Sequence, residues 1–192
     1  MEYNGNEKII GFDLDGVILD HTANKIRLAA QYGVTLTPEE THAERMGGFF
    51  SEDIYRAIKA ELYNQTDGRE ASPLMKGAFA GLATLREHNV PYLLISLQQN
   101  PMFAQHLIEL HGLWGTYFTQ ENTFFAKDGN EKSLRARDLG VTHYVDDEGN
   151  ILDLMQSVST RVLFDSFDQF PDRENFVRVT NWGELTETLL KY

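Results

Sequence analysis

Two carboxylates lie two residues apart, directly after an apolar run near the start of the chain. The run Ile9-Ile10-Gly11-Phe12 leads into Asp13-Leu14-Asp15, and Gly16 follows at once. A short apolar run that meets a glycine predicts a buried strand ending in a turn. Residues i and i+2 of a strand point to one face, so we expect Asp13 and Asp15 to begin on the same side.

The charge of such a pair must be offset. Two close carboxylates repel each other, so either one of them holds a proton or a cation lies between them, and a hard ion with oxygen ligands such as Mg²⁺ is suitable. A calcium loop is excluded because it needs a glutamate at its twelfth position, which is Asn24 when counted from Asp13. A solvated acidic turn and a nucleophilic aspartate with an acid/base partner and a metal both stay open here.

Polar residues also end two later apolar segments. The segment from Val90 closes with Ser96, and Thr142-His143-Tyr144-Val145 runs into the pair Asp146-Asp147. Each has a plain structural interpretation, since serine commonly ends a strand and paired aspartates commonly form turns. The carboxyl ends of parallel strands share one edge of a sheet, where they can converge. The three ends together therefore favour a shared site.

The elements that must position these residues alternate between strand and helix. Strands are expected near 8–13, 90–96, 117–125, 142–147, 161–164 and 176–179, with helices near 77–88, 101–111, 131–139, 150–158 and 184–190. This alternation predicts an α/β fold with a doubly wound parallel sheet.

An insert interrupts this alternation after the first strand. Between Thr22 and Pro73 the pattern is helical, and Thr37-Pro38-Glu39-Glu40 predicts a helix start with a capping box. We therefore expect residues 1–20 and 74–192 to form the α/β domain, and residues 21–73 to form a small helical subdomain.

Composition limits the partners. The 192 residues carry a net charge of −12 and include no cysteine. The negative charge argues against nucleic acid, and it requires any anion site to be made positive by a metal, a lysine or helix N-termini. The lack of cysteine excludes disulfides and thiolate chemistry and fits a reducing compartment. Met1 to Lys8 shows no signal peptide, and no apolar run approaches the ~20 residues that span a bilayer. We expect a cytoplasmic protein without a membrane partner.

Three segments together resemble the haloacid dehalogenase-like (HAD) superfamily, in the form its phosphatases use. Asp13-Leu14-Asp15-Gly16-Val17-Ile18 resembles the first motif, Leu94-Ile95-Ser96 the second and Val145-Asp146-Asp147-Glu148-Gly149-Asn150 the fourth. The resemblance implies that Asp13 attacks phosphorus, that Asp15 is the general acid/base and that Ser96 binds the phosphoryl group.

The resemblance also implies a metal site and a lysine. Mg²⁺ would be held by Asp13, by the backbone carbonyl of Asp15 and by Asp147, with Asp146 as the alternative to Asp147. Lys132, expected in the first turn of a helix capped by Asn130, is favoured as the phosphate-binding lysine of the third motif, and Lys127 is its rival.

Some positions depart from the family pattern or give little information. Asn150 stands where many members have another Asp, and Gln98-Gln99 stand where smaller residues are common. In the insert, the candidate substrate contacts are His21, His42, Arg45 and Arg56, although a solvated or salt-bridged side chain is favoured for each.

The function implied is a Mg²⁺-dependent phosphomonoester hydrolase that acts on a small phosphorylated metabolite through an aspartyl-phosphate. The insert falls where the family places its helical C1 cap. The alternatives are a phosphomutase or phosphonate hydrolase that uses the same nucleophile, or a binding protein that keeps the fold without turnover. A dehalogenase is disfavoured because Asp15 and the acidic fourth motif suit phosphate with Mg²⁺. The natural substrate and the oligomeric state are left open.

Overall fold

The structure is a computed structural model that describes residues 8–63, 72–98 and 100–191. The loop predicted before Pro73 lies mostly outside the described residues, as does Gln99. Six parallel strands form one sheet in the order β3-β2-β1-β4-β5-β6. The strands are β1 (Ile10–Phe12), β2 (Tyr92–Leu97), β3 (Thr123–Ala126), β4 (His143–Asp146), β5 (Thr160–Phe164) and β6 (Val177–Val179). The predicted parallel α/β sheet is confirmed.

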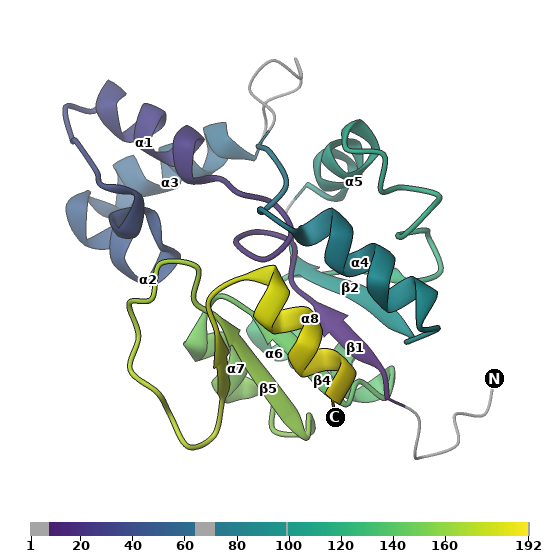
Figure 1. The fold of residues 1–192 in the computed structure, drawn as a ribbon. Helices are drawn as coiled ribbons and strands as arrows, with labels where there is room; N and C mark the ends of the chain where they lie inside the picture. Colours follow the sequence, from purple (N-terminus) through teal and green to yellow (C-terminus); the bar gives the residue numbers. More distant parts are fainter. Residues whose placement is uncertain (1–7, 64–71, 99, 192) are drawn as a thin grey trace.

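Helices cover both faces of the sheet (Figure 1). On one face, Phe12, Leu94 and Val145 pack in a core with α4 (Ala78–Glu87), α5 (Pro101–Leu110) and α8 (Trp182–Lys191). On the other face, a second core includes residues of α6 (Gly129–Asp138) and α7 (Gly149–Leu154). Strands buried on both faces explain the nearly continuous apolar runs in the sequence.

The strand order reverses between β1 and β4. From β1 the chain continues to β2 and β3 on one side, and then crosses to β4 on the other side. Phe12 pairs with Val145, and the Asp13 N–H donates to the Val145 carbonyl at 2.9 Å. Open α/β sheets bind ligands outside the carboxyl ends of the strands at such a switch point. This register brings Asp13 and Asp146 to the same edge.

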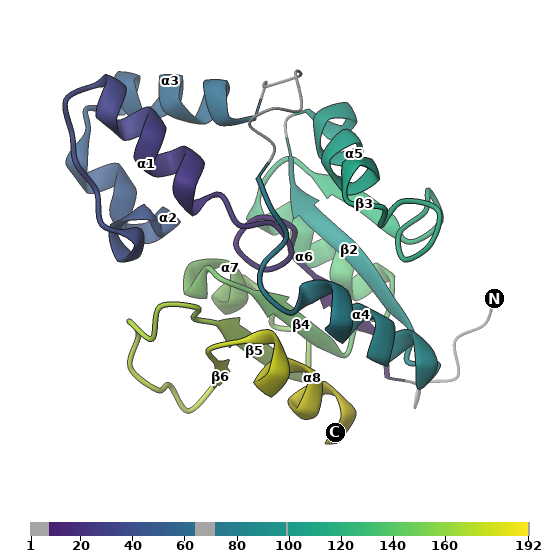
Figure 2. The same ribbon diagram turned by 45° about the horizontal axis from the view of Figure 1, so that its top comes forward.

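Residues 22–62 form a helical unit beside this edge, which we call the helical insert (Figure 2). It contains α1 (Thr22–Gln31), η1 (Pro38–Thr41), α2 (Ala43–Met46), η2 (Gly47–Phe49) and α3 (Glu52–Leu62). A small apolar core of its own holds it together, built from Leu28, Ala29, Leu36, Met46, Ile58 and Leu62.

The helix predicted to start at Thr37 is only a short 3₁₀ turn. The Thr37 N–H donates to Glu40 Oε2 at 2.8 Å, as the capping box predicts. The turn ends at Thr41 because His42 takes a non-helical backbone, with φ −58° and ψ 139°, and α2 begins after it. The start signal was correct, and the length was wrong.

The two connections between the insert and the sheet run side by side. Leu19 and Leu74 form an antiparallel bridge, and the Asp20 N–H donates to the Pro73 carbonyl at 2.8 Å. The Met75 N–H donates to the Ile18 carbonyl at 2.8 Å. The insert is therefore anchored through a paired segment just beyond Asp15. Within the described part of the chain, no helix has the length and apolarity to cross a membrane.

Candidate active site

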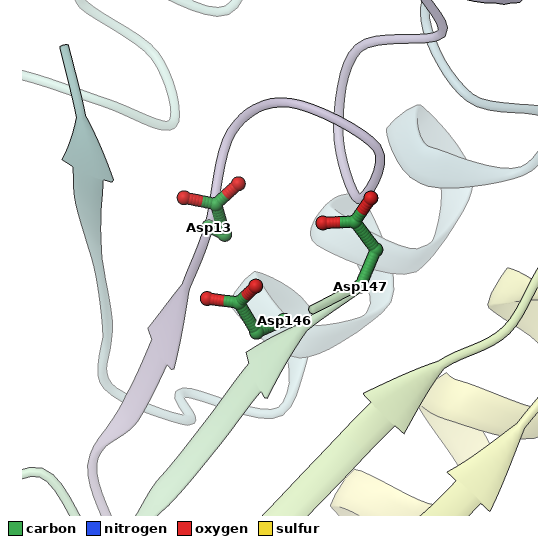
Figure 3. Close-up of side chains that lie close together, drawn as sticks. All are labelled: Asp13, Asp146 and Asp147. Atoms are coloured by element: carbon green, nitrogen blue, oxygen red, sulfur yellow. The ribbon is translucent and has the colours of Figure 1, made fainter. Parts of the chain in front are cut away.

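Three carboxylates gather beyond the ends of β1 and β4 (Figure 3). Asp13 follows β1 directly, Asp146 ends β4 and Asp147 follows it. One oxygen from each lies within 4.8 Å of the others. Asp13 and Asp146 are buried, so their charges cannot be offset by bulk water. The cluster needs protons or cations close by.

Gly16 allows Asp147 to come this close to the loop after β1. Its φ is +80°, in the left-handed region, and a Cβ added there would lie 2.2 Å from Asp147 Oδ2. Glycine thus meets two requirements at this position, the backbone turn and the close approach of a carboxylate.

Lys132 supplies the nearest positive charge. Its Nζ lies 2.6 Å from Asp13 Oδ1 and 2.7 Å from Asp146 Oδ2, and the residue is 1% exposed. The N-cap of α6 is Asp128, whose Oδ1 accepts from the Glu131 N–H at 2.9 Å. The predicted N-cap, Asn130, is wrong, because the helix begins two residues earlier.

The pKa values reflect the crowding of these groups. Burial raises the pKa of Asp146 to about 7, and the Lys132 ammonium prevents a larger shift. Burial, followed by repulsion from Asp146 and Glu148, raises the pKa of Asp147 well above its usual range. Burial lowers the pKa of Lys132, but the attraction of Asp13 and Asp146 outweighs it, so the net shift is upward. Lys132 therefore stays charged, and the acids favour a further cation.

The side chain of Asp15 lies apart from this cluster. Its Oδ1 is 2.6 Å from His21 Nε2, and its Oδ2 accepts from Gln98 Nε2 at 3.4 Å. The geometry separates one carboxylate from the group of three, as the predicted division between an acid/base and metal ligands requires.

The phosphate-binding role of Ser96 stays a prediction. The residue is 1% exposed, and its Oγ finds no hydrogen-bond partner in the described part of the chain. It shares a face with Leu94, which packs in the core below α4 and α5. Strand β2 ends at Leu97, and the polar residues Gln98 and Asn100 beyond it line the cavity.

The structure also distinguishes the two candidate lysines, Lys127 and Lys132, and shows the contacts of Asn150. Lys127, the rival lysine, is exposed and lines the rim of the site cavity, whereas Lys132 lies among the carboxylates. The Asn150 side chain accepts from the Ile151 N–H at 2.8 Å, and its own backbone N–H donates to Glu44 of the insert. Asn150 therefore takes part in local structure and in a contact with the insert.

A cavity of about 760 Å³ lies between the sheet edge and the helical insert. Asp13, Asp15, Asp147 and Lys132 line it from the sheet side. The insert contributes Lys25, Ala43, Arg56, Lys59 and Ala60, and Tyr63 follows at its end. A recess of about 300 Å³ shares several of these residues and extends into the insert, toward Met46, Ile58 and Leu62.

His42 of the insert is buried against the fourth-motif segment. Its Nδ1 accepts from the Glu44 N–H at 3.2 Å, so its Nε2 carries the hydrogen and donates to the Asp147 carbonyl at 3.0 Å. Its ring also meets Phe170, with 4.8 Å between centroids. Burial lowers the pKa of His42, which favours the neutral ring. The favoured interpretation was a solvated or salt-bridged side chain: His42 is not solvated, but its Nε2 also lies 3.8 Å from Asp147 Oδ2, within salt-bridge distance.

Solved structures share the fold of nearly the whole chain. No protein-family model and no curated protein sequence matches it. Among solved structures, a HAD hydrolase of family IA, variant 3, from Entamoeba histolytica aligns with a TM-score of 0.64 at 15% identity, covering 96% of this chain and 100% of the other. The chain has the HAD-like fold.

Two further HAD-like structures agree. A HAD family hydrolase from Deinococcus radiodurans R1, with bound phosphate and sodium, aligns with a TM-score of 0.62 at 17% identity, covering 98% of this chain and 97% of the other. The HAD-hydrolase YfnB from Bacillus subtilis, bound to magnesium, aligns with a TM-score of 0.60 at 15% identity, covering 96% and 99%. The predicted resemblance is thus confirmed at the level of the HAD-like fold.

Proposed function

We propose that this HAD-like protein is a Mg²⁺-dependent phosphomonoester hydrolase that acts through an aspartyl-phosphate on Asp13. The observation that carries the proposal is the buried Lys132 bridging Asp13 and Asp146, with the Asp147 carboxylate alongside, at the switch point of the sheet. A site for phosphoryl transfer needs this set of parts: a positioned nucleophile, fixed positive charge and a place for a metal.

The residues present fit Mg²⁺. The donors are carboxylate oxygens, which hard divalent ions prefer, and Gly16 leaves room for Asp147 at the loop. Asp13, Asp147 and the Asp15 backbone carbonyl would hold the ion, while both oxygens of Asp146 are engaged, Oδ2 by Lys132 Nζ and Oδ1 by the Glu148 N–H. When bound, Mg²⁺ would neutralise charge on the phosphoryl oxygens. The magnesium-bound Bacillus subtilis structure has the same fold and supports this choice.

Asp13, Asp15 and Lys132 each have a separate role in the proposed reaction. A carboxylate oxygen of Asp13 attacks phosphorus as the bond to the leaving oxygen breaks, and Asp15 gives that oxygen its proton. Water next attacks the phosphorus of the aspartyl-phosphate, Asp15 takes a proton from it, and phosphate leaves with Asp13 restored. Lys132 orients Asp13 throughout and stabilises the negative charge that builds up.

The cavity supports a small anionic substrate. In a chain with net charge −12, its wall includes Lys25, Lys59 and Lys127 besides Lys132. Residues 21–73, which include the helical insert, would form a cap. This cap would select the leaving group through the recess near Met46 and Ile58. A cytoplasmic location and the exclusion of nucleic acid and membrane partners stay predictions from composition.

The test is hydrolysis of 4-nitrophenyl phosphate by the full chain. We expect activity with Mg²⁺, loss with EDTA, and loss of at least about a thousandfold in Asp13→Asn. Asp138→Asn, which alters an exposed acid paired with Arg137, is the matched control and should keep full activity. Activity that survives Asp13→Asn would refute the assigned nucleophile.

A panel of phosphorylated metabolites then separates the alternatives. Release of inorganic phosphate supports the hydrolase. Isomerisation of a sugar phosphate without phosphate release would instead identify a phosphomutase on the same nucleophile. Binding without turnover of any ester would identify a binding protein.

A further inference from the structure

A line of buried polar groups leads from Asp15 to both connections of the helical insert. His21, at the end of the outgoing connection just before α1, places Nε2 at 2.6 Å from Asp15 Oδ1. Its other ring nitrogen, Nδ1, lies 2.5 Å from the Ser72 hydroxyl, which belongs to the returning connection. His21 and Ser72 are each 3% exposed. The imidazole is therefore held at both nitrogens, without bulk water.

The hydrogen bonds fix which group donates to Asp15. Asn24 Nδ2 donates to Ser72 Oγ at 3.1 Å, so the serine hydroxyl can direct its own hydrogen to His21 Nδ1. When Oδ2 carries the proton for the leaving oxygen, Oδ1 can only accept, so His21 Nε2 must carry a hydrogen toward it. His111, at the end of α5, also hydrogen-bonds the Ser72 carbonyl, at 2.7 Å. The sheet domain thus fixes the far end of the line.

The two oxygens of Asp15 have different surroundings. Oδ1 is bound by His21, whereas Oδ2 faces Gln98 Nε2 at the longer distance of 3.4 Å. Asp15 and Gln98 both line the cavity. With Oδ1 occupied, the carboxylate plane is fixed and Oδ2 is the oxygen available to a leaving group. Without His21, rotation about the side-chain bonds could move Asp15 toward Asp13 and Asp147.

We propose that His21 is a positioning residue for Asp15: together with Ser72 it fixes the carboxyl group so that Oδ2 delivers the proton to the leaving oxygen. The inference rests on the proposed function, because it assigns His21 a part in the proton transfer by Asp15. A general acid contributes about 10² to 10⁴-fold, and a misplacement of about 1 Å can remove about 10²-fold. The plain alternative is a buried histidine that only stabilises the connections.

A pair of substrates of similar size separates these two roles. The 4-nitrophenolate ion leaves from 4-nitrophenyl phosphate without a proton, whereas benzyl alcohol leaves from benzyl phosphate only when its oxygen is protonated. The quantity to compare is kcat/KM, which covers the steps up to release of the alcohol. The measurements use the full chain with Mg²⁺ and the variants His21→Ala, His21→Gln and Ser72→Ala. His88→Ala, at an exposed histidine after α4, is the matched control.

The proposal predicts a selective loss. In His21→Ala, kcat/KM for benzyl phosphate should fall about 10²-fold, and that for 4-nitrophenyl phosphate should stay within about threefold. His21→Gln can present an amide N–H at a similar reach and should restore benzyl phosphate turnover to within about tenfold of the wild type. In Ser72→Ala, kcat/KM should fall about three- to tenfold for benzyl phosphate and not for 4-nitrophenyl phosphate. The double variant with His21→Ala should show no further loss, because the two residues act as one unit.

Equal losses on both substrates, or no loss on either, would overturn the proposal, as would a glutamine variant no better than the alanine one. Thermal unfolding of each variant shows which are folded, and if His21→Ala is not, Ser72→Ala decides by the same selectivity. Failure of the proposed function has a different signature: a wild type inactive on both esters, or activity that persists in Asp13→Asn.

Discussion

Lys132 is the side chain on which the charge balance of the candidate site depends. It is buried between two aspartates that are also buried, so each charge is stabilised only by its immediate neighbours. Such pairs add little net stability compared with an apolar core, but removing one partner leaves an uncompensated charge in a low-dielectric environment. The lysine therefore affects both folding and chemistry.

Replacing Lys132 by methionine should destabilise the protein and abolish activity. The volume is nearly kept, but Asp13 and Asp146 lose their cation, at a cost of about 3–5 kcal/mol in the free energy of unfolding. Urea unfolding with EDTA measures this, and phosphate release measures the activity. Lys127→Met, at the exposed rival, should change the free energy of unfolding by less than about 0.5 kcal/mol. Equal stability of the two variants would contradict the buried ion pair.

Gly16→Ala should lower the free energy of unfolding through backbone strain, and it should also displace the Asp147 carboxylate from the site. The left-handed φ alone costs about 1–2 kcal/mol for alanine, and the new Cβ would also collide with Asp147 Oδ2. Gly33→Ala is the matched control, since Gly33 has φ +75° but no neighbouring atom within 4 Å of an added Cβ.

We expect the backbone strain to lower the free energy of unfolding by a similar amount in both glycine variants. Only Gly16→Ala should lose activity, by about 10²-fold or more. Urea unfolding and kcat/KM on 4-nitrophenyl phosphate measure the two effects. A Gly16→Ala protein with normal activity would show that Asp147 does not need this position.

Asp146 should make the metal-free protein less stable as pH rises. Its pKa is about 7 in the folded protein and 3.8 as the ordinary value, so between these values the folded state binds more protons than the unfolded state. The free energy of unfolding contributed by Asp146 therefore falls as pH rises from about 4 to about 7. The lowered pKa values of His42 and His143 act in the opposite direction.

Asp146→Asn removes this contribution together with the part of the raised pKa of Asp147 that Asp146 causes, while the histidines are common to both proteins. Urea unfolding with EDTA at about pH 5 and about pH 8 should show the wild type losing more stability than the variant on the rise in pH. An identical pH dependence of the two proteins would contradict the raised pKa of Asp146.

Most of the candidate site follows from residue types, and the exceptions depend on where elements end. The motifs were enough to choose Asp13, Asp15 and Asp147, which the sheet brings to one edge. Ser96 matches by type, but it is buried within β2, whereas Gln98 and Asn100, beyond the end of the strand at Leu97, line the cavity. His21 was named only as a candidate substrate contact, and its place between Asp15 and Ser72 could not be predicted from spacing, because Ser72 follows only after the whole insert.

At the scale of elements, the junction between η1 and α2 joins the insert to the sheet edge that carries Asp13, Asp146 and Asp147. His42 interrupts the helical backbone there, and its ring donates to the Asp147 carbonyl while packing on Phe170. Gln169, next to that phenylalanine, donates to the Glu39 carbonyl at 3.0 Å. The loop after β5 thus contacts the same part of the insert, which fixes the docked position.

His42→Ala should weaken this docking. The loss of one partly buried hydrogen bond, about 0.5–1.5 kcal/mol, should raise KM about two- to tenfold and speed hydrogen exchange over residues 38–49. His42→Gln, which can keep an N–H donor, should be less affected, and His88→Ala should match the wild type. Unchanged exchange in His42→Ala would show that other contacts hold the insert.

Element types were predictable because the local signals and the tertiary burial agree. The apolar strand before Ser96 and the strand that ends in Asp146 both lie in the sheet interior, as continuous apolar runs predict. The prediction was wrong in length at Thr37, where a local capping signal starts a turn that a long-range contact of His42 ends. No local pattern contains that contact.

At the scale of the molecule, metal binding and stability should be linked. The crowded carboxylates of Asp13, Asp146 and Asp147 oppose folding without a cation, and an ion that binds only the folded state stabilises it. At 100 times its dissociation constant, Mg²⁺ should add about 2.7 kcal/mol and raise Tm by about 5–10 °C. Thermal unfolding of Asp147→Asn should show little of this rise, and Asp138→Asn all of it. An equal rise in both would place the ion elsewhere.

The central place of β1 in the sheet affects how the chain is assembled during synthesis. This strand leaves the ribosome first, yet its two neighbours, β2 and β4, follow only after the insert and after residue 142. Until then Ile9, Ile10 and Phe12, all buried in the finished fold, have no complete core to enter. We therefore expect folding to be dominated by distant pairings, hence slow and sensitive to aggregation, with the acidic centre forming only when the second half of the chain has emerged.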